Sequence, residues 1–480
     1  MSIYKRNFTK KTKIVATLGP STNSKEIIRE MVYAGVNVFR INFSHANYDI
    51  VKENINWIRE INDEEEFSIG ILADLQGPKL RIGIVEENSF LHPGDILTFT
   101  NEKITGNSKR VFMTYKQFAQ DVKVNERILI DDGKLILEVI ETDSNNEVKA
   151  RVIQGGPLNS KKGVNLPNTN VSLPALTEKD VKDALFAIEQ EVDWIALSFV
   201  RHAQDVIDLK NLIKEKSPHK IPICAKIEKP EALENIEEII PQCDALMVAR
   251  GDLGVEIPME EVPIAQKMLV DQAKIARKPV IIATQMMESM ISSLTPTRAE
   301  VNDVANSVMD GADAVMLSGE TSVGTYPVEV IKTMSNILRT VENDSHISIP
   351  PHPPTVTDGD RYITNVICFN AAKMAEHTET KAIVTITYSG YTAFQISSHR
   401  PNANIFIFTP NRKIMGMLNL LWGVEAFYYH GDKSTDETVI EVNRFLKRSN
   451  LVQDGDYVIN LNAMPVFKKG ITNTLRFTTI

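Results

Sequence analysis

Short runs of apolar, largely β-branched residues recur through the first two-thirds of the chain, and their near-continuous hydrophobicity predicts strands buried on both faces. Amphipathic stretches with helical periodicity lie between several of these runs, for example at residues 49–61, 178–190 and 262–277. Alternating helices and strands predict a parallel sheet, and eight such strands predict a closed (β/α)8 TIM barrel. The predicted strands are residues 13–19, 37–43, 68–75, 193–200, 221–228, 245–251, 279–285 and 314–318.

About a hundred residues after the third predicted strand have a different character, with Gly, Asn and Asp turn signals between short segments of alternating polarity. They predict a small β-barrel domain, residues 78–174, inserted into a barrel formed by residues 1–77 and 175–345. A proline-rich segment marks the start of a third domain, residues 346–480. There an open α/β sheet is predicted from helices at 364–377, 392–398 and 437–448 and strands at 382–387, 405–408 and 456–461.

Composition narrows the class of protein. The 480 residues are 43% hydrophobic and 24% charged, as in ordinary globular chains, and the net charge of −9 argues against binding to duplex nucleic acid. No apolar run approaches the roughly 18 residues of a membrane span, and no signal peptide is recognisable. Cys224, Cys243 and Cys368 lack the spacing of metal ligands, which favours reduced thiols in a cytoplasmic protein.

The fifth predicted strand ends in Lys226 and Glu228, which point to the same side because side chains alternate along a strand. A buried Lys or Glu is rare unless it is paired or binds a ligand. The next predicted strand is followed by Asp252. Taken alone, these three residues are consistent either with a structural ion pair or with a metal bound to an anionic substrate.

Polar residues follow nearly every predicted barrel strand, at the ends where barrel enzymes build their active sites. A purely structural explanation predicts only an occasional polar residue there, so the pattern favours catalysis. Cations suit a phosphorylated substrate, two carboxylates suit Mg²⁺, and phosphoryl transfer uses both. Arg250 and Glu320 fit a structural ion-pair network better than a direct role. The candidates are Arg40, Asn42, Ser44, His45, Asp74, Lys79, Arg81, Ser198, Lys226, Glu228, Gly251, Asp252 and Thr284.

Six long motifs are similar to those of the pyruvate kinase family, and the resemblance covers essentially the whole chain. The family's architecture, a barrel with an inserted lid and a C-terminal α/β domain, matches the one predicted above. The motifs are TKIVATLGP (12–20), FRINFSH (39–45), KKGVNLP (161–167), MVARGDLGVEI (247–257), ATQMMESM (283–290) and PTRAE (296–300).

The resemblance implies transfer of a phosphoryl group from phosphoenolpyruvate to ADP, giving pyruvate and ATP, in a cytoplasmic homotetramer. It implies that Lys226 stabilises the moving phosphoryl group, that Arg40 grips the phosphate, and that Glu228 and Asp252 hold Mg²⁺, for which Mn²⁺ can substitute. Closure of the inserted domain would exclude water from the reaction.

The resemblance also implies how the rest of the substrates bind. The backbone of Gly251 and Asp252, together with Thr284, would bind the carboxylate end of phosphoenolpyruvate. Thr284 would also lie near the path of the proton to the enolate carbon. Nucleotide contacts are implied for Asn42, His45, Arg81 and Lys162.

One departure from the family concerns monovalent cations. Many members carry Glu where this chain has Lys79, and they bind K⁺ with residues that correspond to Asn42, Ser44, Asp74 and Leu75. The lysine resembles a subgroup that does without K⁺, because a tethered ammonium can replace a mobile cation. We therefore expect little dependence on K⁺.

A second departure concerns regulation. Residues 385–393 run from a predicted strand through a glycine turn into a helix, a geometry in which N–H groups and hydroxyls bind phosphate. The segment resembles the family's allosteric site, which implies a sugar phosphate or AMP bound by Thr387, Ser389, Gly390 and Thr392. Tyr391 stands where arginine is often found, and the loop at 463–470 lacks the usual basic and aromatic partners. Regulation and its absence are both open at this point.

Two other functions also stay open. A different Mg²⁺-dependent barrel enzyme acting on pyruvate or an enolate, such as an aldolase or lyase, would share Glu228, Asp252 and an arginine. It would need neither the lid nor Lys162. The other is a non-catalytic binding or scaffold protein on this fold, although the complete set of acids and cations argues against it.

Overall fold

The computed structural model describes residues 10–344, 347, 349–355, 361–430, 434–464 and 470–480. Eight parallel strands close into a barrel in the order β1-β16-β15-β14-β13-β12-β3-β2, which confirms the predicted (β/α)8 barrel. Each observed strand lies within a predicted one and is somewhat shorter. They are β1 (Lys13–Thr17), β2 (Val38–Asn42), β3 (Gly70–Asp74), β12 (Trp194–Leu197), β13 (Ile223–Ile227), β14 (Ala245–Ala249), β15 (Val280–Ala283) and β16 (Ala314–Leu317).

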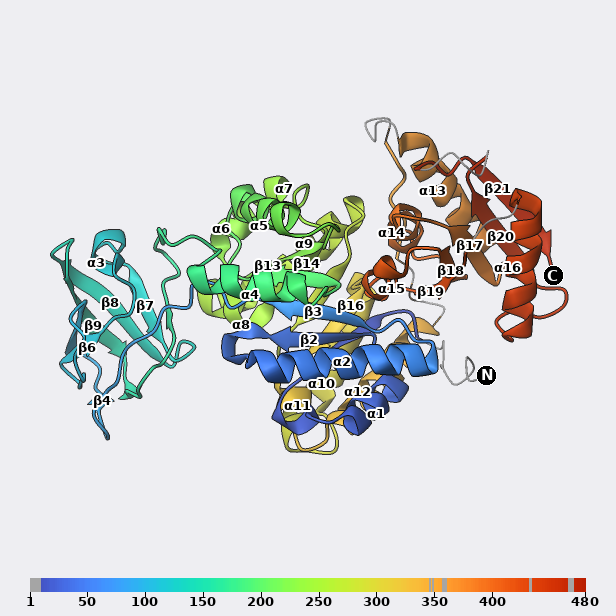
Figure 1. The fold of residues 1–480 in the computed structure, drawn as a ribbon. Helices are drawn as coiled ribbons and strands as arrows, with labels where there is room; N and C mark the ends of the chain where they lie inside the picture. The colour runs from blue at the N-terminus through green and yellow to red at the C-terminus, as the bar shows by residue number, and fades with distance from the viewer. Residues whose placement is uncertain (1–9, 345–346, 348, 356–360, 431–433, 465–469) are drawn as a thin grey trace.

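Helices surround the barrel and cover its outer face (Figure 1). The predicted sixth strand is too long, because Arg250 and Gly251 begin a helix instead of ending β14. An acid in the first helical turn, here Asp252, interacts favourably with the helix dipole. The barrel helices are α1 (Lys25–Ala34), α2 (Tyr48–Glu65), α4 (Glu178–Glu189), α5 (Ala203–Lys216), α6 (Pro230–Glu234), α7 (Ile236–Ile239), α8 (Arg250–Glu256), α9 (Val262–Ile275), α10 (Arg298–Asp310), α11 (Gly319–Ser322) and α12 (Pro327–Glu342).

Alternation along each barrel strand sorts its side chains into an inner and an outer layer. In β13, Cys224 belongs to the cluster inside the barrel, whereas Ala225 packs among residues of the surrounding helices. Lys226 follows Cys224 by two positions and Glu228 by four. Both therefore face the barrel axis at the carboxyl end of the strand.

The inserted domain lies beyond the carboxyl ends of the barrel strands, at the left of Figure 1, and has its own apolar core between Leu80 and Leu166. Its main sheet has the order β11-β7-β8-β9-β5-β6. The elements are β4 (Phe90–Leu91), β5 (Ile96–Thr100), β6 (Arg110–Phe112), α3 (Phe118–Asp121), β7 (Arg127–Ile130), β8 (Leu135–Thr142), β9 (Glu147–Gln154), β10 (Gly156–Pro157) and β11 (Val164–Asn165).

The C-terminal domain contains a five-stranded sheet in the order β19-β18-β17-β20-β21, as an α/β pattern predicts. Two of its strands, β19 and β21, were not predicted. They form the two edges of the sheet, and none of the residues of β21 is buried, so neither has the hydrophobic run of a central strand. The elements are α13 (Tyr362–His377), β17 (Ala382–Ile386), α14 (Tyr391–Ser398), β18 (Asn404–Thr409), α15 (Met415–Leu418), β19 (Val424–Tyr428), α16 (Thr435–Arg448), β20 (Tyr457–Asn462) and β21 (Thr474–Thr479).

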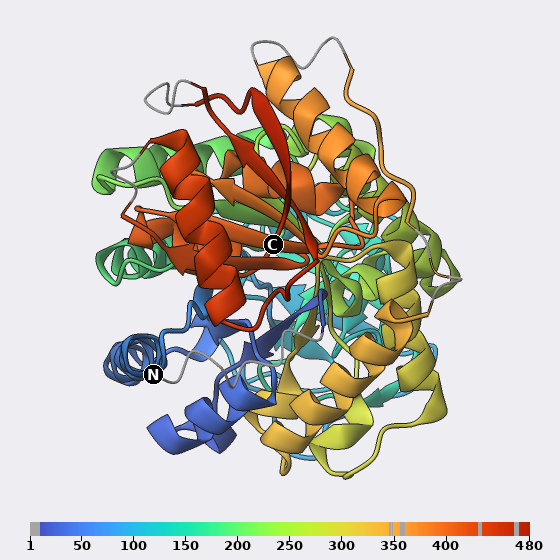
Figure 2. The ribbon, with the colours of Figure 1, turned by 90° about the vertical axis from the view of Figure 1, so that its right-hand side faces the viewer.

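The C-terminal domain covers the amino-terminal ends of the barrel strands, opposite the inserted domain (Figures 1 and 2). Trp194 Nε1 donates a hydrogen bond to the Met417 carbonyl at 3.1 Å. Leu420 is fully buried and packs with the cluster inside the barrel. The approach at Gly416 is close, since a Cβ there would lie 2.2 Å from Asp193 Oδ1. Among the described residues, the C-terminal domain thus covers the amino-terminal end of the barrel, and the mouth lies at the carboxyl ends of the strands.

The three cysteines are free and buried. Burial raises the pKa of the Cys243 and Cys368 thiols to about 12, so both stay protonated at neutral pH. Among the described residues, no helix combines the length and apolar character needed to cross a bilayer.

Candidate active site

Lys226 lies at the centre of a buried cluster at the carboxyl end of β13. Its ammonium lies 3.0 Å from Glu228 Oε1 and 3.2 Å from Asp74 Oδ1, and it donates a hydrogen bond of 2.7 Å to Ser198 Oγ. The side chains of Glu228 and Asp74 are each 1% exposed. The lysine is thus held in one position by two carboxylates and a hydroxyl.

The charged groups of this cluster shift one another's pKa values. Burial opposes the charged form of Lys226, but Asp74 and Glu228 outweigh it and raise the pKa of the lysine. Burial also disfavours ionised Asp74, but Lys226 and Arg40 lower its pKa below the ordinary value. For Glu228, burial dominates and raises the pKa, with Lys226 opposing and Asp252 adding to the rise. A further cation beside Glu228 would therefore stabilise its ionised form.

Arg40 joins the cluster from β2. Its Nε donates to Asp74 Oδ2 at 2.6 Å, and its Nη1 donates to Thr17 Oγ1 at 3.0 Å. Asp74 therefore contacts both Arg40 and Lys226, the two cations expected to bind the phosphoryl group. The side chain of Arg40 is 12% exposed, which leaves part of the guanidinium accessible from the barrel mouth.

Glu228 and Asp252 form a pair of carboxylates that interact electrostatically across neighbouring strand ends. Glu228 Oε2 accepts a hydrogen bond from the Phe199 N–H at 2.7 Å. Asp252 lines a cleft and makes no hydrogen bond or ion pair with another described residue. Within the described ranges, no three His, Cys, Asp or Glu side chains gather as a metal site. Two repelling carboxylates, one facing a cleft, fit Mg²⁺ when the substrate supplies further oxygens.

Thr284 follows β15 in a left-handed conformation, with φ of 70°, which is strained for a β-branched residue. Its hydroxyl accepts a hydrogen bond from the Gly251 N–H at 2.7 Å and donates one to the Ala283 carbonyl at 2.6 Å. Arg250 Nη2 donates to the Thr284 carbonyl at 2.8 Å, and Nη1 pairs with Asp303 at 2.6 Å. Arg250 is thus part of an ion pair that supports the strained threonine.

Glu320, the other residue with an expected structural role, also supports the backbone. Its carboxylate accepts hydrogen bonds from the N–H groups of Met287 at 3.1 Å and Ser318 at 2.7 Å. It makes these contacts with amides, and it forms no ion pair with any residue in the part of the chain that the structure describes.

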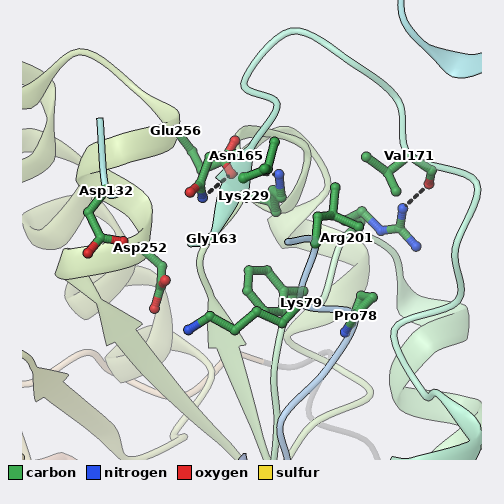
Figure 3. A pocket seen from close by; sticks show the side chains of 13 residues that line it. Pro78, Lys79, Asp132, Gly163, Asn165, Val171, Arg201, Lys229, Asp252 and Glu256 are labelled. Carbon is green, nitrogen blue, oxygen red and sulfur yellow. Dashed lines mark hydrogen bonds and ion pairs between the residues drawn. The ribbon is translucent and has the colours of Figure 1, made fainter. Parts of the chain in front are cut away.

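A cleft lies between the barrel and the inserted domain (Figure 3). Lys79, Asp132 and Asp252 are among the residues that line it. In Figure 3 the side chain of Lys79 extends toward the side of the cleft that carries the two aspartates. Lys226 does not line this cleft, so the cleft adjoins the lysine cluster through Asp252.

The residues expected to contact a nucleotide are divided between the barrel and the inserted domain. Asn42 ends β2, and its Oδ1 accepts a hydrogen bond from the Ser44 N–H at 3.0 Å. Arg81 Nη1 donates to the Lys161 carbonyl at 2.9 Å, and Lys162 pairs with Asp131 at 2.9 Å. The side chain of His45 lies outside the described residues. Arg81 and Lys162 are thus bound to partners of the inserted domain.

The residues that correspond to a K⁺ site already have partners. The Leu75 carbonyl accepts a hydrogen bond from Ser198 Oγ at 2.7 Å, and Asp74 contacts two cations. The side-chain oxygen of Asn42, Oδ1, caps the turn that contains Ser44.

The expected effector segment begins α14. Thr387 Oγ1 accepts a hydrogen bond from the Gly390 N–H at 3.0 Å, and the hydroxyls of Thr392 and Thr472 lie 3.0 Å apart. The Arg361 guanidinium lies 4.0 Å from the centre of the Tyr391 ring. A guanidinium is therefore present beside this segment although the sequence motif lacks one. Residues 465–469 of the nearby predicted loop lie outside the described residues.

Sequence reasoning missed three residues at the edge of the site. Lys229 Nζ lies 2.7 Å from Glu256 Oε1, and Asn165 of the inserted domain donates to the same oxygen at 2.9 Å. An acid four residues after Asp252 lies on the same helical face, which is a signal that could have identified Glu256.

Comparisons with known proteins agree with this arrangement. The family model for the pyruvate kinase barrel domain matches residues 9–331, and the model for the pyruvate kinase alpha/beta domain matches residues 365–478. A pyruvate kinase of Corynebacterium efficiens is 43% identical over 97% of both chains, and one of Mycobacterium tuberculosis is 41% identical over 97% of this chain and 98% of its own. The crystal structure of a pyruvate kinase from Cryptosporidium parvum has a TM-score of 0.91 and 32% identity, covering 98% of this chain and 96% of that one. The chain therefore belongs to the pyruvate kinase family and is a phosphotransferase.

Proposed function

We propose that the protein transfers the phosphoryl group of phosphoenolpyruvate to ADP, giving pyruvate and ATP. The observation that carries this proposal is the charged, buried Lys226 held between Asp74 and Glu228 at the barrel mouth. Family membership supports the same reaction.

The reaction breaks the bond between phosphorus and the enol oxygen and forms a bond from phosphorus to a β-phosphate oxygen of ADP. Phosphoryl transfer of this kind depends on positioning and charge stabilisation. Lys226 would stabilise the charge on the moving group, because its contacts with Asp74 and Glu228 fix its position beforehand. Arg40 would bind the phosphate with the part of its guanidinium that Asp74 leaves free.

Glu228 and Asp252 would hold Mg²⁺, or Mn²⁺ in its place. The bound ion would supply the positive charge that neutralises the oxygens of the substrates. Without it, the two carboxylates repel each other and Glu228 has a raised pKa.

Departure of the phosphoryl group leaves an enolate, which takes a proton at its methylene carbon to form pyruvate. Thr284 is placed to orient this step, because its hydroxyl is fixed between the Gly251 N–H and the Ala283 carbonyl. A hydroxyl is a weak acid, so we propose that Thr284 relays a proton from water. Gly251 has no Cβ, so the substrate carboxylate could approach this backbone closely and would replace the Thr284 hydroxyl as the acceptor of the Gly251 N–H.

The inserted domain would act as a lid. Arg81 and Lys162 lie on its hinge side, and Asn42 and His45 lie at the barrel end. Closure would bring both groups to the nucleotide and exclude water, which limits hydrolysis of the substrates.

A coupled assay that measures pyruvate released from phosphoenolpyruvate tests the reaction. We expect release to require both ADP and Mg²⁺. Mg²⁺-dependent turnover of an enolate substrate without ADP would instead indicate a lyase or aldolase.

We further propose that activity does not require K⁺. The cations Arg40 and Lys226 already compensate Asp74, and the Leu75 carbonyl already has a donor. Assays with tetramethylammonium as the only monovalent cation should therefore give the same rate as assays with K⁺. A Lys79→Glu variant should become dependent on K⁺. Strong activation of the unmodified enzyme by K⁺ would contradict the proposal.

Two family properties complete the proposal. An effector with a phosphate group would bind at Thr387, Ser389, Gly390 and Thr392, where Arg361 supplies a nearby cation. Titration of AMP, fructose 1,6-bisphosphate and sugar monophosphates against the phosphoenolpyruvate saturation curve tests this, and flat responses to all would contradict the proposed effector site.

A homotetramer in the cytoplasm is also proposed, in keeping with three buried free thiols. Light scattering of the purified protein measures the mass of the assembly.

A further inference from the structure

A buried ion pair joins the two segments that carry the proposed metal ligands. Lys229 directly follows Glu228, and Glu256 lies one helical turn after Asp252 in α8. Lys229 Nζ and Glu256 Oε1 are 2.7 Å apart, and their side chains are 10% and 0% exposed. The ends of β13 and β14 are therefore linked by a contact that can transmit movement from one carboxylate to the other.

The Glu256 carboxylate also contacts the inserted domain, the proposed lid. Asn165 at the end of β11 donates its amide to Glu256 Oε1 at 2.9 Å. Figure 3 shows Asn165, Lys229 and Glu256 gathered at one wall of the cleft that Asp252 also lines. In the described part of the chain, the other oxygen of Glu256 is buried and has no hydrogen-bond partner.

We propose that Glu256 is a positioning residue that couples the position of the lid to the spacing of Glu228 and Asp252. The proposal rests on the proposed role of these two residues in holding the metal. A fully buried carboxylate with two donors on one oxygen is poorly compensated when either donor leaves. Loss of the Asn165 amide would draw Glu256 toward Lys229, and α8 would move with it.

Coupling of this kind works in both directions, because linkage between two sites is reciprocal. The lid contact would strengthen metal binding, and metal binding would stabilise the lid contact. A residue that merely supports the fold would show neither effect.

Binding of Mn²⁺ to the free enzyme, measured by electron paramagnetic resonance, tests the first direction. Residues around metal ligands typically change affinity by 10- to 100-fold, so we expect Asn165→Ala and Glu256→Gln to raise the Mn²⁺ dissociation constant by roughly 10-fold. Asn165→Ala removes one amide from a partly exposed strand end while Lys229 still pairs with Glu256, so it should lower the melting temperature only slightly. Arg201→Gln is the matched control, because Arg201 contacts the lid carbonyls of Val171 and Leu173 without touching Glu256. It should leave the dissociation constant unchanged.

Hydrogen exchange of the β11 amides tests the second direction. Mn²⁺ should slow this exchange in the unmodified enzyme and leave it unchanged in Glu256→Gln. The coupling is wrong if Glu228→Gln abolishes Mn²⁺ binding while Asn165→Ala binds Mn²⁺ as tightly as the unmodified enzyme. If Glu228→Gln itself binds Mn²⁺ normally, the proposed metal site is wrong and the coupling fails with it.

Discussion

At the scale of single residues, Lys226 illustrates how a site keeps a buried charge. Removing an ammonium from water is costly, and the lysine stays charged only because Asp74 and Glu228 more than offset that cost. The contacts with these two carboxylates also hold the ammonium of Lys226 in one position. Stability and preorganisation thus come from the same pair of carboxylates.

Substitution of Lys226 should separate catalysis from folding. We expect Lys226→Met to lower kcat by about 10³-fold, the order of effect seen when a cation that stabilises a transferring phosphoryl group is lost. Lys13 provides a control, because it is also buried and donates to the Val424 carbonyl at 2.7 Å at the opposite end of the barrel. Lys13→Met should reduce stability and leave kcat unchanged. Steady-state kinetics and thermal melts measure both, and equal losses of kcat would contradict the assignment.

At the scale of elements, the barrel could be predicted because its strands are continuous apolar runs, and parallel strands place their carboxyl ends together. That geometry brought Arg40, Asp74, Lys226 and Glu228 into contact, as their positions at strand ends indicated. The end of β14 was predicted too late, because the strand ends at Ala249 and α8 begins at Arg250 with no turn between them.

Other features of the site are not readable from local sequence. The positive φ of Thr284 depends on hydrogen bonds from Gly251 and Arg250, which come from another strand end. The contact of Asn165 with Glu256 joins two domains and appears only after both are placed.

The end of α14 carries a pH-sensitive group. His399 is 2% exposed and packs edge-on against Phe369, and neither ring nitrogen has a hydrogen-bond partner among the described residues. Burial, reinforced by Arg277, His352 and Arg400, lowers its pKa from 6.5 to about 3.

This shift has a defined sign for stability. Between about pH 6.5 and pH 3 the unfolded chain binds a proton at His399 that the folded chain does not, so stability is lost as the pH falls. The slope is at most about 1.4 kcal/mol per pH unit. His399→Leu should remove it, which would appear as a smaller difference in urea stability between pH 7 and pH 5 than in the unmodified protein. Identical differences would show that His399 titrates normally.

At the scale of the whole molecule, the barrel meets a domain at each end, and the two contacts differ. The inserted domain contacts the barrel near the cleft, for example where Asn165 donates to Glu256. The C-terminal domain is held by a buried, bidentate ion pair in which both terminal nitrogens of Arg400 contact Asp313 at 3.1 and 2.8 Å. These side chains are 3% and 4% exposed.

Two ion pairs across this boundary should differ sharply in their effect on stability. Arg400→Met leaves Asp313 buried without its partner, and we expect a loss of about 3–5 kcal/mol. Lys413 and Glu191 also pair across the boundary, but they are 48% and 53% exposed. Lys413→Gln should therefore cost at most about 1 kcal/mol. Denaturant titrations compare the two variants, and similar losses would contradict this ranking.

The contact of α15 with the barrel has a consequence for biosynthesis. Leu420 fills part of the barrel interior, and the glycine at 416 allows the chain to approach Asp193 closely. When β16 has been synthesised, the nascent chain contains all eight barrel strands. It still lacks Leu420, the side chain that covers the amino-terminal end of the barrel interior. We therefore expect the barrel to become fully stable only after residue 420 has left the ribosome.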